Sequence, residues 1–452
     1  MLTPDTVQPV DIADVINGSP YQSYTYSYPH KTAYRLLEQP IPLNEVWNAE
    51  NQSALFLYLH VPFCEHRCGF CNLFTQANPE KGLTQRYLRQ LQNEAQHARD
   101  ALDTDAKFAQ LAIGGGTPTF LDEGELEQLL NLCIELGADG NTIPVSIEVS
   151  PPTVTPEKLK LLSDFGTDRV SIGIQSFNEA EAKRLGRPQK TADVVAALEA
   201  IRRANFPILN IDLIYGGEGQ SVDQWMACVR EAVQWKPEEL YLYPLYVRAL
   251  TGLGRLDRQW DDQRLEAYTE ARSLLLSEGY EQTSMRMFQR TNTAAAVRQP
   301  SDSAVYRCQA DGMVGLGCGA RSYTRTLHYS TEYAVGRRGV HSILLDYLNR
   351  PTESFSAARY GYQLPTEDRQ RRFAIMSLLQ SDGIARREYE LAFGVDVLQH
   401  IPELSAMQQH RLATMDDDRI QLTSDGMARS DAIGPWLYSE RVRKLMQHYE
   451  LV

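Results

Sequence analysis

Between about residues 53 and 280, short apolar runs alternate with longer stretches whose apolar residues recur at helical spacing. The runs have the length and the Ile, Val and Leu content of buried strands, and the stretches have the length of helices. Parallel strands joined by helices form right-handed βαβ units, so this alternation predicts a parallel sheet covered by helices. The predicted strands are LFLYLHV, FAQLAI, VSIEV, RVSIGI, ILNIDLIY and ELYLYPLY, and the predicted helices span residues 84–102, 123–136, 155–165, 178–185, 191–204, 221–235 and 261–278.

Six strand–helix units are fewer than the eight that close a (β/α)8 barrel. We therefore expect an α/β fold with an open, partial (β/α)6 barrel. One helix start supports this interpretation, because Thr155, Pro156 and Glu157 follow the pattern of a capping threonine before a first-turn proline.

Changes in composition predict further segments on both sides of the barrel. The first is rich in Pro, Tyr and Ser with little periodicity, which indicates an arm rather than a domain. The last is mostly helical and ends in a winged-helix-like pattern, a strand over 419–422 followed by a helix opened by Ser424 or Asp425. The predicted segments are an N-terminal arm at 1–50, a barrel core at 51–290, a barrel extension with the Gly-rich GMVGLGCGARSYTR at 291–364, and a C-terminal domain at 365–452.

The charge of the chain restricts its partners. It has 58 acidic and 45 basic residues, a formal net charge of −13. Nucleic acids and anionic membranes are bound through concentrated basic surfaces, so neither is an expected partner. The longest near-apolar stretch, around residues 54–63, is far shorter than the roughly 20 residues of a membrane-spanning helix. Without the basic head and apolar block of a secretory signal at the N-terminus, we expect a cytoplasmic protein.

Three of the seven cysteines, Cys64, Cys68 and Cys71, fall within eight residues after the first predicted strand. An odd number of cysteines and such a tight cluster favour metal or redox chemistry over disulfides. A structural zinc site is one interpretation, but zinc takes four ligands and no second Cys or His pair with matching spacing follows. A [4Fe–4S] cluster held by three thiolates keeps one iron open for a substrate or cofactor.

The spacing CxxxCxFC after the first strand of a βα barrel, with Phe70 at the aromatic position, resembles the radical S-adenosylmethionine (SAM) superfamily. The resemblance implies that Cys64, Cys68 and Cys71 hold a [4Fe–4S] cluster whose fourth iron binds SAM. It also implies that one electron cleaves SAM to methionine and a 5′-deoxyadenosyl radical, which removes hydrogen from the substrate. For such chemistry the protein supplies orientation and a dry cavity.

A closer resemblance, over nearly the whole chain, is to the oxygen-independent coproporphyrinogen III oxidases and their relatives. It implies that Tyr58 contacts SAM beside the cluster, that the loop 114–117 faces the methionine amino group, and that Glu148 binds the ribose. Tyr58 and Glu148 are therefore the predicted catalytic residues. The segments that carry the resemblance are YLHVPFC, GGGTPT, SIEVSP, SIGIQSFN, LGRPQ and NIDLIYG.

The same resemblance assigns a second set of residues. Gln175, Arg187 and Asp212 match positions that contact a second SAM molecule in the oxidases, and here they bind that molecule or the substrate. The alternative without a binding role is that Glu148 and Asp212 are solvated residues at strand ends and that Arg187 is an exposed cation at a helix end. The complete predicted cofactor-binding set is Tyr58, Phe70, Gly115, Gly116, Thr117, Glu148, Gln175, Arg187 and Asp212.

Two departures from the family leave the reaction open. The oxidases carry a fourth cysteine two residues after the third, and this chain has Leu73 there. The heme-chaperone branch has a His-Asn…Tyr-Trp stretch before the Gly-rich segment, and this chain has Tyr306-Arg307-Cys308-Gln309. Other branches comprise two-SAM enzymes that methylate or cyclopropanate and anaerobic heme-opening enzymes.

Arginines that follow the barrel in sequence are candidates for binding a polyanionic substrate, since the guanidinium fork suits carboxylates. Ordinary surface positions are the alternative for all of them. Cys308 and Cys318 flank the same region, and they are candidates for donating a hydrogen atom, for binding a ligand or for being buried free thiols. The helical spacing of Cys133 and Cys228 indicates core positions. The arginines are Arg286, Arg290, Arg321 and Arg325.

We therefore predict an iron–sulfur enzyme that reductively cleaves SAM and acts on a small molecule, with a tetrapyrrole as one candidate. The expected cofactors are a [4Fe–4S] cluster and one or two SAM molecules, and the family implies a reduced flavodoxin or ferredoxin as electron donor. The alternatives are a heme carrier or chaperone on the same fold and a two-SAM methyltransferase or cyclopropanase. A C-terminal DNA-binding wing is a third alternative, which the acidic charge disfavours.

Overall fold

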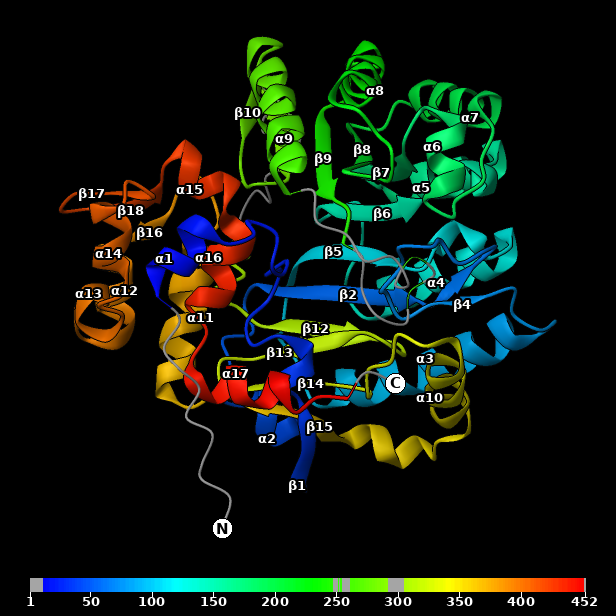
Figure 1. The fold of residues 1–452 in the computed structure, drawn as a ribbon. Helices are drawn as coiled ribbons and strands as arrows, with labels where there is room; N and C mark the ends of the chain where they lie inside the picture. Colours follow the sequence, from blue (N-terminus) through cyan, green and yellow to red (C-terminus); the bar gives the residue numbers. More distant parts are fainter. Residues whose placement is uncertain (1–10, 247–250, 252, 254–260, 292–304, 451–452) are drawn as a thin grey trace.

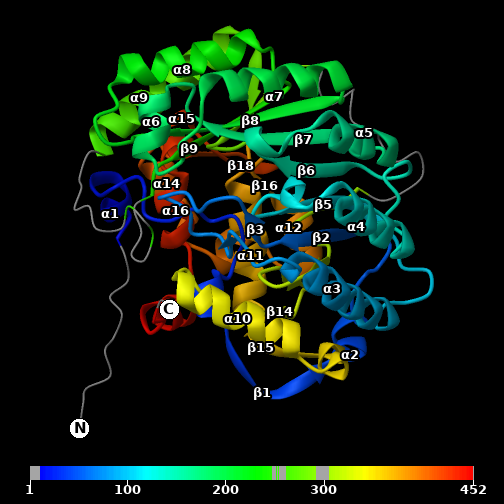
Figure 2. The same cartoon turned by 90° about the vertical axis from the view of Figure 1, so that its right-hand side faces the viewer.

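The computed structural model describes residues 11–246, 251, 253, 261–291 and 305–450. Its largest element is one sheet of thirteen strands, in the order β1-β15-β14-β13-β12-β2-β5-β6-β7-β8-β9-β11-β10 (Figure 1). The helices that connect the central strands lie along one face of this sheet, and both terminal regions lie toward the other face (Figure 2). We call the helix-covered side the outer face and the opposite side the inner face.

Six strands at the centre of the sheet run parallel, which confirms the predicted βα units. They are β2 (Leu55–Val61), β5 (Phe108–Gly115), β6 (Val145–Val149), β7 (Arg169–Gln175), β8 (Ile208–Tyr215) and β9 (Glu239–Pro244). The helices after them are α3 (Leu83–Asp100), α4 (Glu123–Glu135), α5 (Pro156–Phe165), α6 (Glu179–Arg184), α7 (Thr191–Ala204), α8 (Val222–Gln234) and α9 (Asp261–Ser277). The hydroxyl of Thr155 accepts the Lys158 N–H at 3.3 Å, so the predicted cap of α5 is present.

Both edges of the parallel core are extended by strands that periodicity did not predict. On one edge β12 (Met313–Leu316) pairs with β2 in parallel, and antiparallel strands continue the sheet. These are β13 (Arg321–Tyr323), β14 (Leu327–Ser330), β15 (Ala357–Gln363) and β1 (Arg35–Pro42); β11 (Met287–Arg290) and β10 (Tyr280–Gln282) extend the other edge. Helix α10 (Arg337–Asn349) and the 3-10 turn η5 (Thr352–Ser356) connect β14 to β15.

Burial alternates along the central strands in a way that shows where the main core lies. In β6, Val145, Ile147 and Val149 are buried beneath the helices, whereas Glu148 on the inner face is exposed. In β2 the inner-face side chains of Phe56 and Tyr58 likewise keep partial exposure. The core therefore lies between sheet and helices, and the inner face stays accessible at the carboxyl ends of the strands.

The C-terminal region packs around a second hydrophobic cluster. Its three-stranded antiparallel sheet, β16-β18-β17, matches the predicted strand at 419–422, and α15 begins at Ser424 with Thr423 as its cap. Its elements are α11 (Thr366–Leu378), β16 (Ile384–Ala385), α12 (Arg386–Phe393), α13 (Val397–His400), α14 (Leu404–Gln409), β17 (Ala413–Met415), β18 (Arg419–Leu422), α15 (Ser424–Ala428), α16 (Ser430–Trp436) and α17 (Glu440–Gln447).

The N-terminal arm contains α1 (Ile12–Asn17), the 3-10 turn η1 (Lys31–Ala33), β1 and α2 (Leu43–Trp47). The tyrosine-rich part of the arm contacts both the C-terminal region and the barrel. The Thr25 and Tyr438 hydroxyls are hydrogen-bonded at 2.8 Å, and the Tyr24 ring lies 6.4 Å from that of Tyr243 on β9. The arm is thus held between the C-terminal region and the inner face of the barrel.

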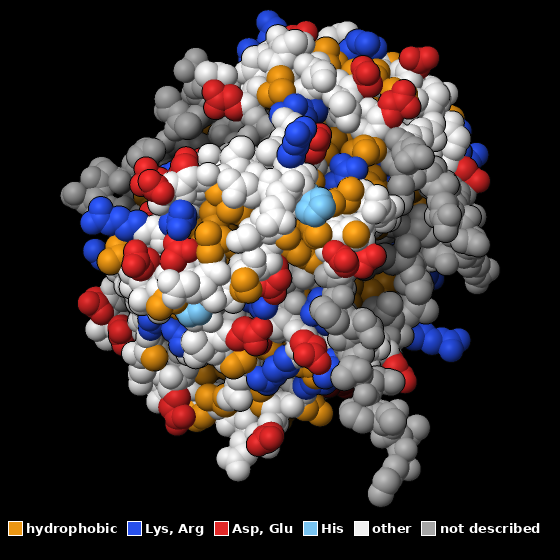
Figure 3. All heavy atoms as spheres, turned by 60° about the vertical axis from the view of Figure 1, so that its left-hand side comes forward, with side chains coloured by type: hydrophobic (Ala, Val, Ile, Leu, Met, Phe, Trp, Pro, Cys, Tyr) orange, Lys and Arg blue, Asp and Glu red, His pale blue; other side chains and the backbone are white. Residues whose placement is uncertain are grey.

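Among the helices of the described residues, none combines the length and apolarity needed to cross a bilayer. On the face shown in Figure 3, acidic and basic side chains are interspersed over the surface.

Candidate functional site

The three clustered cysteines lie on the segment from β3 (Phe63–Cys64) to β4 (Gln76–Ala77), a short parallel pair that follows β2. This cysteine loop is fixed at its middle, because the Gly69 N–H donates to the Leu185 carbonyl at 3.0 Å. A Cβ on Gly69 would lie 2.9 Å from the same oxygen, so the close approach requires glycine. The loop is therefore held against the segment that follows α6.

The thiols of the cysteine loop influence one another. Burial raises the pKa of Cys64 to about 12, and the nearby Cys71 and Cys68 thiols raise it further. Burial also raises the pKa of Cys68, whereas Arg187, with Nη1 3.4 Å from the Cys68 sulfur, acts against this rise. A bound metal cation deprotonates the thiols that coordinate it. Burial thus disfavours free thiolates at Cys64 and Cys68, and these two thiols suit a metal group that supplies positive charge.

The chemistry of these donors bears on which metal group the cysteine loop can hold. A single zinc ion needs ligand atoms that converge on one centre at roughly 2.0–2.3 Å. In the part of the chain that the structure describes, no three Cys, His, Asp or Glu side chains converge on a point suited to one ion. In an iron–sulfur cluster each thiolate binds its own iron, so its sulfurs stand further apart. Three thiol donors on one short loop supply the ligand type that binds a [4Fe–4S] cluster.

The glycine loop after β5 packs directly on the cysteine loop. The Gly116 N–H donates to the Val61 carbonyl at 2.7 Å, and the Thr117 N–H donates to the Phe63 carbonyl at 2.8 Å. The Thr117 hydroxyl lies 3.7 Å from the sulfur of Cys64. The predicted cofactor residues Gly116 and Thr117 thus lie beside the first cysteine.

Gly115 and Glu148 meet at the same edge of the sheet. Gly115 has φ +113°, and a Cβ there would lie 2.7 Å from the His60 ring. Its N–H donates to Glu148 Oε2 at 3.1 Å. Glu148 is accessible but enclosed by the surrounding strands, and this enclosure raises its pKa to about 7, with Asp212 raising it further. A carboxyl of this kind can accept hydrogen bonds from a ligand's hydroxyl groups.

Gln175 at the end of β7, Asp212 within β8 and Arg187 after α6 also come together. Arg187 Nη2 donates to the Gly173 carbonyl at 2.7 Å, and Gly173 pairs with Asp212 across the two strands. A Cβ on Gly173 would lie 2.9 Å from Nε2 of Gln175, which itself has φ +70°. Burial raises the pKa of Asp212, although Arg169 acts against this rise. The predicted second set thus forms one polar patch next to Cys68.

Two predicted residues flank these groups. Phe70, in the cysteine loop, packs on an apolar cluster of Leu185, Ile214 and Leu245. Tyr58 lies on the inner face of β2, two residues before His60. The predicted site residues therefore lie in the middle or carboxyl-terminal parts of the parallel strands and in the loops that follow them, as expected for a βα barrel. Their roles remain predictions.

Sequence reasoning missed His60, which holds two parts of the site together. Its Nε2 lies 2.9 Å from the Phe74 carbonyl and its Nδ1 3.2 Å from the Tyr58 hydroxyl. A carbonyl can only accept, so Nε2 carries the proton and Tyr58 donates to Nδ1. Burial lowers the pKa of His60 to about 4, so the ring is neutral. The available signal was a polar residue at the same strand face as Tyr58 within an apolar run.

The arginines and remaining cysteines have different surroundings. Arg286 is buried and paired with Asp431, and Arg325 pairs with Glu50 at 3.4 Å, whereas Arg321 lies on the inner face. Buried thiols are confirmed at Cys133, Cys228 and Cys318, while Cys308 is partly buried.

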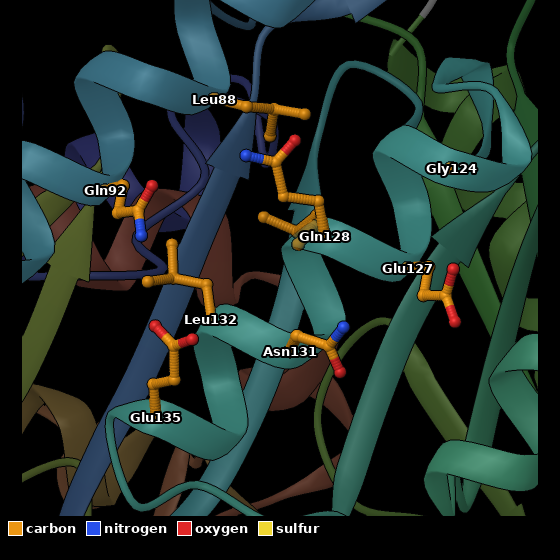
Figure 4. A pocket seen from close by; sticks show the side chains of 9 residues that line it. Leu88, Gln92, Gly124, Glu127, Gln128, Asn131, Leu132 and Glu135 are labelled. Atoms are coloured by element: carbon orange, nitrogen blue, oxygen red, sulfur yellow. The ribbon is translucent and has the colours of Figure 1, made fainter.

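A groove on the outer face lies apart from this site. It has a volume of about 290 Å³ between α3 and α4 and contains none of the predicted site residues (Figure 4). Its lining residues are Leu88, Gln92, Gly124, Glu127, Gln128, Leu129, Asn131, Leu132 and Glu135.

Comparison with known families identifies the class. Residues 58–232 match the model of the radical SAM superfamily, and residues 364–429 match the HemN C-terminal domain. The resemblance to the radical SAM superfamily that the cysteine spacing predicted is therefore confirmed for the segment that holds the cysteine loop, and this superfamily implies a [4Fe–4S] cluster and SAM as cofactors.

Within that superfamily the chain is HemN-like. It is 27% identical to the oxygen-independent coproporphyrinogen III oxidase of Pseudomonas aeruginosa over 82% of this chain and 83% of that protein. It is 26% identical to the heme chaperone HemW of Bacillus subtilis over 75% of this chain and 86% of that protein. Among solved structures, coproporphyrinogen III oxidase (HemN) from Escherichia coli matches with a TM-score of 0.76 at 23% identity, covering 94% of this chain and 98% of that one, which confirms the fold.

Proposed function

We propose that this chain is a radical SAM enzyme that binds a [4Fe–4S] cluster through Cys64, Cys68 and Cys71 and acts on a tetrapyrrole. The observation that carries the proposal is the contact between three elements at one edge of the sheet. Thr117 of the glycine loop lies 3.7 Å from the Cys64 sulfur, and Gly115 of the same loop donates to Glu148 at 3.1 Å. One ligand next to the cysteines would therefore reach the loop and the carboxylate together.

The residues around this edge have separate tasks in the proposal. When bound, the cluster and SAM supply the 5′-deoxyadenosyl radical that starts the reaction. Gly115 gives the ligand room to approach the backbone, and Glu148 accepts hydrogen bonds from its ribose hydroxyls. His60 fixes the orientation of the Tyr58 hydroxyl, because its Nδ1 accepts a hydrogen bond from that hydroxyl at 3.2 Å.

Gln175, Arg187 and Asp212 hold a second ligand, either another SAM molecule or the substrate. Their patch adjoins Cys68 through the 3.4 Å contact of Arg187 with its sulfur. A tetrapyrrole is favoured as substrate by the similarity to coproporphyrinogen oxidases over most of the chain. We further propose a reduced flavodoxin or ferredoxin as electron donor, on the same family similarity.

The test is an anaerobic assay of the full chain reconstituted with iron and sulfide. Addition of SAM and dithionite is expected to produce 5′-deoxyadenosine, and the Cys133→Ala variant, altered in the core, is the matched control for loss of a loop cysteine. Addition of coproporphyrinogen III is expected to accelerate SAM consumption and yield a decarboxylated product. An intact cluster that leaves SAM uncleaved would refute the enzyme.

A heme chaperone is the second candidate, favoured by Leu73 at the position of the oxidases' fourth cysteine and by the similarity to HemW. Leu73 is 47% exposed and offers the substrate no thiol. Stoichiometric heme binding with an intact cluster and no 5′-deoxyadenosine would establish this candidate instead. Methylated or cyclopropanated products in the same assay would indicate two-SAM chemistry.

A further inference from the structure

Three arginines near the inner face differ in how their charge is balanced. Arg169 pairs with Glu239 at 2.6 Å, and the buried Arg286 pairs with Asp431. For Arg321, by contrast, no carboxylate of the described residues lies within salt-bridge distance. An enclosed cation without a counter-charge is unfavourable, so proteins rarely keep one unless a partner arrives.

Neutral groups surround Arg321. Its Nε donates to the Tyr323 hydroxyl at 2.9 Å, and its guanidinium carbon lies 5.0 Å from the centre of the Tyr26 ring. No described residue accepts a hydrogen bond from its two terminal nitrogens. The residue as a whole is partly exposed, although neighbouring tyrosines enclose its guanidinium, so an anion that enters this face would meet two terminal nitrogens without an acceptor among the described residues.

The sheet places Arg321 across from Tyr58. Tyr58 of β2 pairs with Gly315 of β12, and the pairing of Met313 with Tyr323 puts Gly315 opposite Arg321 on β13. A Cβ on Gly315 would collide with the carbonyl group of Arg321, so glycine lets the backbone of Arg321 fold over Gly315, which lies one strand away from Tyr58. Arg321 therefore lies in the same row of the sheet as Tyr58, two strands away, where a ligand beside Tyr58 would meet it.

Burial and the positive charge of Arg321 both lower the pKa of two neighbouring histidines. Burial lowers the pKa of His60 to about 4, and Arg321 lowers it further. Burial also lowers the pKa of His328 on β14, where Arg372 and Arg321 both add to the effect. The region between β2 and β14 thus favours an anion.

We propose that Arg321 binds a carboxylate of the substrate, so that the substrate lies between Tyr58 and β13 with the rings of Tyr26 and Tyr323 beside it. Only the guanidinium's two terminal nitrogens are open, which matches the bidentate geometry of a carboxylate. This inference rests on the proposed function, because it takes the substrate of that site to be an acidic tetrapyrrole.

The test compares two ligands that differ in charge, coproporphyrin III and its tetramethyl ester. Each is titrated into the anaerobically reconstituted protein with SAM, and binding is followed by porphyrin fluorescence. We expect the native chain to bind the free acid at least 10-fold more tightly than the ester. Arg321→Gln should weaken binding of the acid by about 10- to 100-fold and of the ester by less than about 2-fold. The reason is that only the free carboxylate of the acid forms a charged hydrogen bond with the guanidinium, and the variant removes that bond.

Two further variants complete the design. Arg321→Lys keeps the charge without the fork and should fall between native and Arg321→Gln. Arg307→Gln is the matched control, because Arg307 is a surface arginine, 57% exposed and paired with Glu388 at 3.0 Å. Thermal unfolding of each variant identifies any that fails to fold, and Arg321→Lys then carries the comparison.

Three results would overturn the inference. They are native-like binding of the acid by Arg321→Gln, no preference of the native chain for the acid, and a loss of SAM binding in Arg321→Gln as large as its loss of porphyrin binding. The last would assign Arg321 to the carboxylate of SAM. Acid binding that depends on Arg321 without any 5′-deoxyadenosine would support this inference while refuting the enzyme.

Discussion

The two sides of the inner face differ in charge. The acidic wall, Glu148 on β6 and Asp212 on β8, belongs to the parallel core. The basic wall, Arg321 on β13 and Arg372 on α11, belongs to the chain after the barrel, and Arg372 donates to the Cys308 carbonyl at 2.6 Å rather than to a carboxylate. An acidic wall suits the cationic sulfonium and amino groups of SAM, and a basic wall suits an acidic substrate. The comparison supports the proposals that place SAM on the core side and the acidic groups of the substrate on the side of the extension.

The largest effect tests the core side. Cys68→Ala is expected to abolish the iron–sulfur absorbance and to reduce 5′-deoxyadenosine formation by more than about 100-fold, because even outer partners of metal ligands are worth 10- to 100-fold. Cys133→Ala should keep both signals, since Cys133 is buried in the main core. Equal iron content in the two variants would contradict the assignment of Cys68.

The next effect compares a paired arginine with an unpaired one. Arg286→Gln leaves Asp431 buried without its cation and should lower the free energy of unfolding by about 3–5 kcal/mol. Arg321→Gln removes an uncompensated charge and should be neutral or stabilising by up to about 1 kcal/mol in the ligand-free protein. Urea unfolding measures both. Equal destabilisation would show that the charge of Arg321 is already balanced.

The next prediction concerns how stability depends on pH through Glu94, a buried carboxyl next to the extension. Glu94 on α3 accepts hydrogen bonds from the Gly317 N–H and the Tyr347 hydroxyl, each at 2.8 Å, and burial raises its pKa to about 7. A glutamate in the unfolded chain has a pKa of about 4.3. Between about pH 4.3 and pH 7, Glu94 is therefore ionised in the unfolded chain and protonated in the folded chain. The contribution of Glu94 to stability is therefore complete below about pH 4.3 and is lost as the pH rises through 7, by roughly 4 kcal/mol.

Urea unfolding of the native chain and of Glu94→Gln at pH 5 and pH 8 checks this sign. The native chain should lose more stability over that interval than the variant, which has no carboxyl to titrate. The same loss in both would mean that the carboxyl of Glu94 is ionised throughout.

The smallest effect concerns the acidic wall. Glu148→Gln should raise the KM for SAM by about 10- to 100-fold, because a hydrogen bond to a charged acceptor is worth roughly 1.5–3 kcal/mol. Glu127→Gln on the outer face of α4 is the matched control. An unchanged KM with a reduced kcat would place Glu148 outside SAM binding.

Sequence reasoning succeeded where a pattern is local. The parallel strands and their helices were predicted to within a few residues, because each carries its own apolar periodicity. It failed at β12 and β1, whose pairing depends on partners far along the chain; β12 is four residues of a Gly-rich stretch. Likewise, sequence offered four arginines as equals, and only the partners Asp431 and Glu50 separate Arg286 and Arg325 from Arg321.

The placement of the N-terminal arm also sets an order of assembly. The arm is synthesised first, yet β1 pairs with β15, Ser23 binds the Asp431 carbonyl at 3.0 Å and Tyr28 binds Ser439 at 3.1 Å. Contacts that join residues this distant in sequence form late. A growing chain can therefore form the parallel core and its cysteine loop before the partners of the arm, which lie in about the last hundred residues, have been synthesised.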